Sequence, residues 1–346
     1  MKGSRYASLA VVALLAAACS GSSATTAPST AASAAAPSAA ASAGAAWTMP
    51  TDAGSAKGKT IAIISKGEQH QFWQAVKKGA LDAAASLGVT ATYQGPASES
   101  EVDKQLTMLQ TALSTSPAAV CFAALDSKAA TPLLQQAQTA KIPVVGFDSG
   151  VDSTIPVTTV ATDNSVAAAI AADKLAEAIG KSGEVAIVVH DQTSQTGITR
   201  RDGFKAEIAA KYPNVNIVDI QYGAGDVVKS ADIAKAIMTA HPNLKGFFAA
   251  NEGSAKGVLN ALKETSNEKK VLIVGYDSGQ QQIDAITSGV MLGAITQNPI
   301  GIGADCVGAA VDAINGKTLP AKIDTGFYWY DSTNINDAKI QAVLYK

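Results

Sequence analysis

The sequence predicts an α/β protein made of two similar units, each a parallel sheet flanked by helices. The main observation is that residues 142–150 nearly recur as residues 271–279. Each stretch is a short apolar run closed by Gly, an aromatic residue, Asp, Ser and Gly. Apolar runs closed by turn residues are typical of buried parallel strands. Strand and helix patterns alternate along the rest of the chain, which favours sheets covered by helices on both faces.

The repetition extends beyond this motif. Residues 122–127 resemble residues 248–253, which lie 126 positions later, and Asp148 and Asp277 are 129 positions apart. A nearly constant offset indicates two related units; chance similarity between Val-, Ala- and Gly-rich strands is the alternative. The period is too long for a solenoid repeat and suits a domain.

The N-terminus indicates export. An apolar run at residues 7–18 follows Lys2 and Arg5. It is too short to span a bilayer and fits a secretory signal. Cys19 comes next, and small residues ending in Cys resemble the bacterial lipoprotein cleavage site. We therefore expect a lipoprotein signal peptide at residues 1–19 with Cys19 lipid-modified; an ordinary signal peptide cleaved after an Ala is the alternative.

Residues 20–57 are predicted to be a tether. Residues 20–46 are almost wholly Ala, Ser, Thr, Gly and Pro, so they cannot bury enough surface to offset the entropy of ordering. A flexible chain of this length reaches about 30 Å. We expect it to hold the folded body off a membrane surface, which the protein touches only through its lipid.

The remaining chain is long enough for two domains. The formal net charge is −2 and no basic stripe is present, which argues against nucleic acid as a partner. Cys121 falls in a predicted strand and Cys306 in a predicted helix. We expect two buried, unpaired thiols, and a disulfide stays open because spacing alone does not bring two Cys together.

In the first unit, the helix at residues 72–87 is amphipathic and ends before Gly88, a residue favoured just after helix ends. The strands of this unit are expected at residues 60–65, 90–94, 118–124, 142–147 and 157–161, and its helices at residues 72–87, 101–114 and 128–140.

The second unit repeats the alternation. Its helices are expected at residues 165–179, 200–210, 227–240 and 254–264, and its strands at residues 184–189, 215–221, 246–250 and 271–276. A strand at 291–296, a helix at 300–314 and an aromatic cluster at 327–330 follow.

Two acids occupy equivalent places in these units. In open α/β sheets, ligands bind beyond the carboxyl ends of the strands. Asp148 and Asp277 each follow a predicted buried strand at that end. We expect both to hold a ligand; capping the next helix is the alternative role for each.

The body from about Gly58 resembles the ribose-binding-protein family, the type I periplasmic solute-binding proteins of sugar ABC transporters. The matching segments occur in family order at residues 71–73, 78–80, 142–148, 162–164, 200–204, 251–252, 274–277 and 296–299. The resemblance implies two Rossmann-like lobes joined by a three-segment hinge, with one sugar between them. It also implies a monomer without cofactor or metal, and the permease of an ABC importer as partner.

The implied lobes are discontinuous in sequence. The N-terminal lobe comprises residues 58–161 and 298–325, and the C-terminal lobe comprises residues 162–297 and 326–346. The crossovers are implied near residue 162, near residues 297–299 and near residues 325–326. The helix from residue 300 then belongs to the first lobe and the aromatic cluster to the second.

A sugar offers hydroxyls that donate and accept, and an apolar face. Carboxylates accept hydroxyl pairs, amides do both, Arg donates in a fork, and aromatic rings supply flat apolar area. With the resemblance, these chemistries predict the sugar-binding residues His70, Phe72, Trp73, Asp148, Arg200, Asn251, Asp277 and Gln297.

Alternatives remain open for most of these residues. Asn251, expected to be bidentate to a hydroxyl pair, is otherwise a turn residue, and Gln297 a solvated hinge residue. His70 stands where the family often has Asn, and is otherwise structural. Arg201 competes with Arg200 for the ligand. Core packing is the alternative for one of the two aromatic residues.

Two departures from the ribose binder limit the analogy. Ser149 follows Asp148 where the ribose binder has Arg, and the aromatic residue of its second lobe falls near Gly225 here. The donor count and pocket volume therefore differ, and we expect a larger or differently substituted sugar, or a polyol.

The predicted function is extracytoplasmic binding of a monosaccharide or polyol and delivery to an ABC importer by hinge closure, at the outer face of the cell membrane. A sugar sensor that presents its ligand state to a membrane receptor is the alternative. A secreted carbohydrate enzyme is remote: His70, His190 and His241 lack metal-ligand spacing, and the Ser of residues 275–279 is misplaced for a nucleophile elbow.

Overall fold

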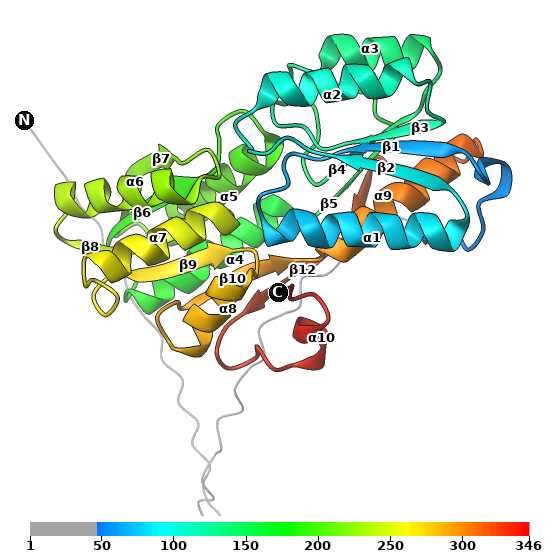
Figure 1. Cartoon of the computed structure of the whole chain (residues 1–346). Coiled ribbons are helices and arrows are strands. Elements are labelled where there is room, and N and C mark those ends of the chain that lie inside the picture. Colours follow the sequence, from blue (N-terminus) through cyan, green and yellow to red (C-terminus); the bar gives the residue numbers. More distant parts are fainter. Residues whose placement is uncertain (1–46, 346) are drawn as a thin grey trace, which may run out of the picture. The chain divides into compact units, whose positions relative to one another are not determined.

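Two six-stranded sheets form the body of the protein (Figure 1). The computed structural model describes residues 47–345; Cys19, the predicted signal peptide and residues 20–46 of the predicted tether lie outside this range. The strand orders are β11-β5-β4-β3-β1-β2 and β12-β10-β9-β8-β6-β7. All pairs are parallel except β10 with β12. The same order therefore occurs twice, which confirms the predicted α/β fold class with two related parallel-sheet lobes.

The strands are β1 (Thr60–Ile64), β2 (Thr90–Gln94), β3 (Ala119–Phe122), β4 (Val144–Phe147), β5 (Thr158–Ala161), β6 (Gly183–Val189), β7 (Val215–Tyr222), β8 (Leu244–Ala249), β9 (Leu272–Tyr276), β10 (Gly293–Gln297), β11 (Lys322–Asp324) and β12 (Phe327–Tyr330). The helices are η1 (Gly54–Ala56), α1 (Gln71–Leu87), α2 (Val102–Ser114), α3 (Thr131–Thr139), α4 (Asn164–Ala178), α5 (Gln195–Lys211), α6 (Val227–Ala240), α7 (Glu252–Glu264), α8 (Gln280–Thr287), α9 (Pro299–Ile314) and α10 (Ala338–Gln341).

The first lobe is built on β1–β5 and β11. Helices α1 and α9 cover one face of its sheet, and α2 and α3 cover the other (Figure 1). The inner strands β1, β3 and β4 are almost wholly buried and mostly apolar, as parallel strands covered on both faces require. Ahead of β1, Trp47 donates its indole N–H to Asp312 on α9 at 3.0 Å, and Ala56 is fully buried, so residues 47–56 pack on this lobe.

A disulfide joins Cys121 on β3 to Cys306 on α9, with their Cα atoms 6.3 Å apart. The expectation of two unpaired thiols was therefore wrong. The physical reason is topological: α9 comes from the far end of the chain and returns to the first sheet, which brings together two residues 185 positions apart.

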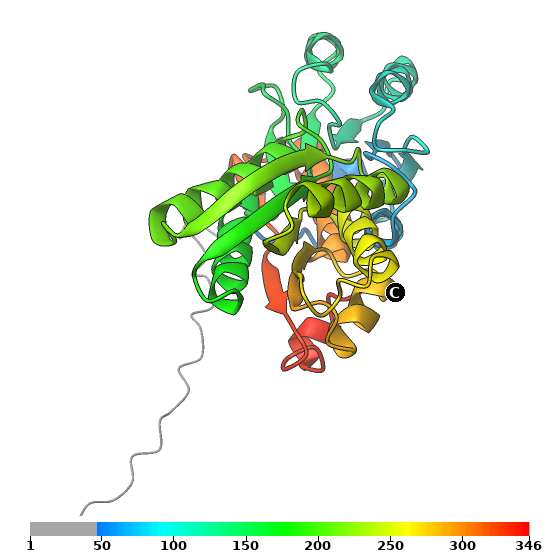
Figure 2. The same ribbon diagram turned by 90° about the vertical axis from the view of Figure 1, so that its left-hand side faces the viewer.

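The second lobe is built on β6–β10 and β12. Helices α4 and α5 pack on one face of its sheet, and α6, α7 and α8 pack on the other. Figure 2 shows β12 (red) beside β10 at the edge of this sheet. The chain passes between the two sheets three times: after β5, after β10, and between β11 and β12.

The structure differs from the sequence expectations at several elements. Helix α5 begins at Gln195 rather than at residue 200, because Ser194 caps it by accepting from the Gly197 N–H at 3.2 Å. Helices η1, α8 and α10 and strand β11 were not predicted; each is short, and its hydrophobic pattern is too brief to read. None of the helices within residues 47–345 has the length and apolarity needed to cross a bilayer.

Candidate ligand-binding site

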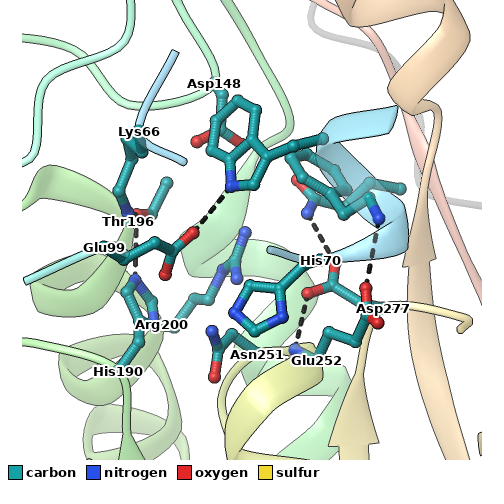
Figure 3. A pocket seen from close by; sticks show the side chains of 13 residues that line it. Lys66, His70, Glu99, Asp148, His190, Thr196, Arg200, Asn251, Glu252 and Asp277 are labelled. Atoms are coloured by element: carbon teal, nitrogen blue, oxygen red, sulfur yellow. Dashed lines mark hydrogen bonds between the residues drawn. The ribbon is translucent and has the colours of Figure 1, made fainter. Parts of the chain in front are cut away.

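A cavity lies where the carboxyl ends of strands from both lobes converge (Figure 3). The space among its side chains is about 290 Å³, including the part that opens to solvent. The lining residues are Lys66, His70, Phe72, Trp73, Glu99, Asp148, His190, Thr196, Arg200, Asn251, Glu252, Asp277 and Gln297. All eight residues predicted from the sequence are among them.

The turns that carry Asp148 and Asp277 are alike in backbone. Both residues have positive φ, 54° and 77°, a conformation that Asp tolerates better than most side chains. Each backbone N–H donates to the neighbouring strand, at 2.8 Å to Val160 and at 2.6 Å to Ile295. Neither Asp is the N-cap of the helix that follows it in sequence, because α8 is capped at Gly279 and Asp148 leads towards β5. The capping alternative was therefore wrong.

The carboxylate of Asp148 accepts no hydrogen bond from any residue within 47–345, although it is only 5% exposed. Burial raises its pKa to about 6, a rise that the charges of Lys66 and Arg200 limit. A buried carboxylate without donors is costly. Hydroxyl groups of a ligand would supply the donors that the protein does not.

The carboxylate of Asp277 is already held by the protein. Its Oδ2 accepts from the Glu252 N–H at 2.9 Å, and its Oδ1 accepts from Nε2 of Gln297 at 2.8 Å. Burial raises its pKa, while the charge of Arg200 and the Gln297 hydrogen bond oppose the rise. Gln297 is 1% exposed, so it is not a solvated hinge residue.

Arg200, not Arg201, faces the cavity. Its Nε donates to Oδ1 of Asn164 at 2.7 Å, and its Nη1 donates to the Ala250 carbonyl at 2.9 Å. The guanidinium lies 3.7 Å from the centre of the Tyr276 ring. These contacts fix the fork in one orientation. Arg201 is outside the cavity lining and pairs with Asp202.

The aromatic residues form one wall of the cavity. The rings of Phe72 and Trp73 meet edge to face, with centroids 4.9 Å apart. Both belong to the first lobe's core and also line the cavity. Trp73 donates its indole N–H to Oε1 of Glu99 at 2.7 Å, which fixes the plane of the indole. Each of the two aromatic residues therefore packs in the core and also lines the cavity, so the two roles do not exclude each other.

Asn251 has a divided role. Its Oδ1 caps α7 by accepting from the Ser254 N–H at 2.9 Å, so the amide nitrogen is the group it can best offer a ligand. Its turn role and its place in the cavity lining coexist. His70 is 5% exposed, and its Nε2 lies 3.1 Å from the side-chain nitrogen of Gln69.

Five lining residues were not predicted as site residues: Lys66, Glu99, His190, Thr196 and Glu252. His190 directly follows β6 and Lys66 lies two residues after the end of β1, so the strand-end rule that selected the two Asp residues could have found them. Thr196 was missed because α5 was expected to start later. Glu252 was used only as part of the segment 251–252 that resembles the family, and no site role was predicted for it. Glu99 lies in the loop after β2, and its sequence carries no signal.

Lys66 joins the two lobes. Its ammonium donates to Oγ1 of Thr196 at 3.1 Å and lies 3.7 Å from Oδ2 of Asp191. Oγ1 of Thr196 is also 3.1 Å from Nε2 of His190. Burial, reinforced by the charge of Lys66, lowers the pKa of His190. The imidazole is therefore neutral near pH 7.

Glu99 lies against Gly225, which stands between β7 and α6. A Cβ atom on Gly225 would lie 2.7 Å from Oε2 of Glu99, so a larger residue at this position would require the carboxylate to move. Burial by itself would raise the pKa of Glu99, but Lys66 and the hydrogen bond from Trp73 hold it below its usual value. The Gly225 position thus borders an ionised carboxylate.

Known proteins share this architecture. Residues 61–318 match the family model of the periplasmic binding protein domain. The D-allose-binding periplasmic protein of Escherichia coli K12 is 29% identical over 280 residues, which are 78% of this chain and 90% of that protein. The ribose import binding protein RbsB of the same bacterium is 28% identical over 267 residues, 76% of this chain and 87% of its own.

A solved structure gives the same picture. The carbohydrate transporter solute binding protein of Agrobacterium radiobacter, crystallised with D-arabinose, has a TM-score of 0.80 and 32% sequence identity, and covers 83% of this chain and 99% of that chain. The chain therefore belongs to the periplasmic binding protein family. Its two-lobed fold is that of the ribose-binding-like type I members, a class of solute-binding proteins.

Proposed function

We propose that this chain is an extracytoplasmic binding protein for a monosaccharide or polyol, which it delivers to an ABC importer after its lobes close around the ligand. The observation that carries the proposal is the buried carboxylate of Asp148, which lacks a hydrogen-bond donor within residues 47–345 and faces a cavity shared by both lobes. Relatives that bind allose, ribose and arabinose support the same class of ligand.

The chemistry of the lining fits a neutral polyhydroxylated ligand. Asp148 and Asp277 would accept from hydroxyls, Arg200, Asn251 and Lys66 would donate to them, and the aromatic wall would cover the apolar face. Each of these groups has a role in binding, and we therefore propose that the protein binds its ligand without catalysing a reaction. His70 and Gln297 complete the proposed contacts.

The remaining features of the proposal concern cellular context. Lipid attachment at Cys19 would anchor the protein to the outer face of the membrane, and the tether would let the body reach a permease. We propose that the protein acts as a monomer. The proposed lobes are residues 58–161 with 298–325 and residues 162–297 with 326–346.

A thermal-shift screen tests the ligand class. D-allose, D-ribose and D-arabinose head a panel of aldoses, ketoses and polyols. A ligand present at 100 times its Kd should raise the free energy of unfolding by about 2.7 kcal/mol. The shift should be smaller with the Asp148→Ala variant at that concentration, because a tenfold to hundredfold weaker Kd leaves about 1.4 to 0.4 kcal/mol. If no member of the panel shifts the wild-type transition, the proposed ligand class is wrong.

A further inference from the structure

Helix α1 of the first lobe lacks a cap from its own lobe. His70 stands at the N-cap position with extended backbone, and its side chain accepts no hydrogen bond from the helix. The first backbone N–H groups of any helix have no acceptor within the helix itself. Because α1 opens with the two aromatic residues of the cavity wall, these unpaired N–H groups lie beside the ligand site.

Glu252 of the second lobe supplies the missing cap. Its Oε1 accepts from the Gln71 N–H at 3.3 Å, and its Oε2 accepts from the Phe72 N–H at 3.1 Å. Its side chain has no exposed surface. A carboxylate at a helix N-terminus is favoured by these N–H groups and by the helix dipole.

The cap bridges the two lobes and is tied to the site at both ends. On the second lobe, the backbone N–H of Glu252 donates to Asp277, and Lys256 pairs with Oε1 at 2.9 Å. On the first lobe, the carboxylate holds the backbone of Phe72, whose ring lines the cavity. The contact therefore links the ligand acceptor of one lobe to the aromatic wall of the other.

We infer that Glu252 is a positioning residue that latches the two lobes together by capping α1, and that it strengthens ligand binding without depending on the ligand's identity. The inference rests on the proposed hinge closure. Lobes that move apart break both hydrogen bonds, because donor and acceptor belong to different lobes. The cap thus exists only in the closed arrangement, which it stabilises in the ligand-free protein as well as in the complex.

Hydrogen exchange of α1 tests the latch directly. Amides of Gln71 and Phe72 have no intrahelical acceptor, so their protection reports the Glu252 contact. We expect both to exchange about tenfold faster in Glu252→Gln than in the wild type without any sugar, the loss of a charge-assisted hydrogen bond corresponding to about that factor. Unchanged exchange would overturn the inference. Glu264→Gln, the same change at an exposed position of α7, is the matched control.

Sugar binding provides the second measurement. Calorimetry with D-allose, D-ribose and D-arabinose should show about a tenfold weaker Kd in Glu252→Gln for every sugar that binds the wild type. A loss confined to one sugar would instead identify Glu252 as a ligand contact and overturn its positioning role. Glu252→Asp keeps the charge but has a shorter side chain, so exchange of the Gln71 and Phe72 amides should also become faster in this variant. It replaces Glu252→Gln in both measurements if that variant does not fold.

The two proposals fail separately. If none of the sugars binds the wild type while Glu252→Gln still speeds exchange of the two amides, the latch stands and the proposed ligand class fails. If the sugars bind and exchange is the same in both proteins, the ligand class stands and the latch fails.

Discussion

The turns at Asp148 and Asp277 have similar sequences, the same backbone conformation and equivalent positions in the two lobes. Their carboxylates nevertheless differ in their hydrogen-bond partners. Both follow a buried strand, both have positive φ, and both backbone N–H groups bond to the next strand. Asp277 accepts from Glu252 and Gln297, whereas Asp148 accepts from no residue within the described part of the chain. The related turns thus repeat the backbone and differ in what surrounds the acid.

This difference shows that equivalent residues of two related lobes can be held in different ways. Asp277 is preorganised by its own lobe and forms part of the second lobe's wall before any ligand arrives. In the proposed complex, Asp148 would take its hydrogen bonds from the ligand, so the ligand would contribute more to its stabilisation. Preorganisation of Asp277 lowers the free-energy cost of ligand binding. A carboxylate without hydrogen-bond partners, such as that of Asp148, makes ligand binding more sensitive to pH.

The largest expected effect is that of Asp277→Ala. The change removes a ligand acceptor and also leaves the buried Glu252 N–H and the Gln297 amide without an acceptor. We expect sugar affinity to fall on the order of a hundredfold or more, and the free energy of unfolding without ligand to fall by about 1–3 kcal/mol. Calorimetry and denaturant unfolding measure the two quantities. Unchanged stability would show that the protein contacts of Asp277 matter little.

Asp148→Ala should separate binding from stability. It removes a ligand acceptor but leaves no described protein donor unsatisfied, and it deletes a costly buried charge. We expect affinity to fall about tenfold to a hundredfold, with unfolding free energy unchanged or raised. Both Ala variants place a side chain at positive φ, so that strain is shared by the pair. Equal destabilisation of the two variants would remove the distinction between the turns.

The pH dependence of affinity should follow Asp148. Its pKa in the ligand-free protein is raised to about 6, and a ligand that donates to the carboxylate binds the ionised form. Affinity should therefore increase as pH rises through about 6, with about a tenfold loss at pH 5 relative to neutral pH. Without ligand the sign is opposite: the raised pKa favours the folded state at low pH, and this stability is lost as pH rises through 6.

The control for this pH dependence is Asp148→Asn, which has no titrating carboxyl group. Calorimetry from pH 5 to 8 should give a nearly flat profile for the variant. A tenfold loss at pH 5 that persists in the variant would assign the dependence to a different group.

The smallest effect is expected from Gln297→Met, which makes the surroundings of Asp277 more like those of Asp148. The variant keeps the side-chain volume but removes the donor at 2.8 Å. The pKa of Asp277 should rise, and affinity at neutral pH should fall at most about tenfold. The loss should be larger at pH 5, because Asp277 would then titrate as well. An affinity profile identical to that of the wild type at every pH would contradict this.

The sequence predicted much of the site because strand ends carry local signals. Asp148, Asn251 and Asp277 each follow an apolar run that marks a buried strand, and the edge of a parallel sheet is where such residues converge. The family resemblance added His70, Arg200 and Gln297. Glu99 had no such signal, since it lies in a loop without a repeating pattern, and the disulfide between Cys121 and Cys306 depends on a long-range return of the chain.

By itself, the sequence determined the alternation of strands and helices, the duplication of the lobes and the two acids at equivalent strand ends, because these follow from short-range periodicity and turn chemistry. Only the tertiary structure decided which groups surround each acid. Partners such as Glu252 with the Phe72 N–H, or Tyr345 packed 6.1 Å from the Phe72 ring, come from distant segments. Their contacts depend on how the two lobes meet, which no local pattern encodes.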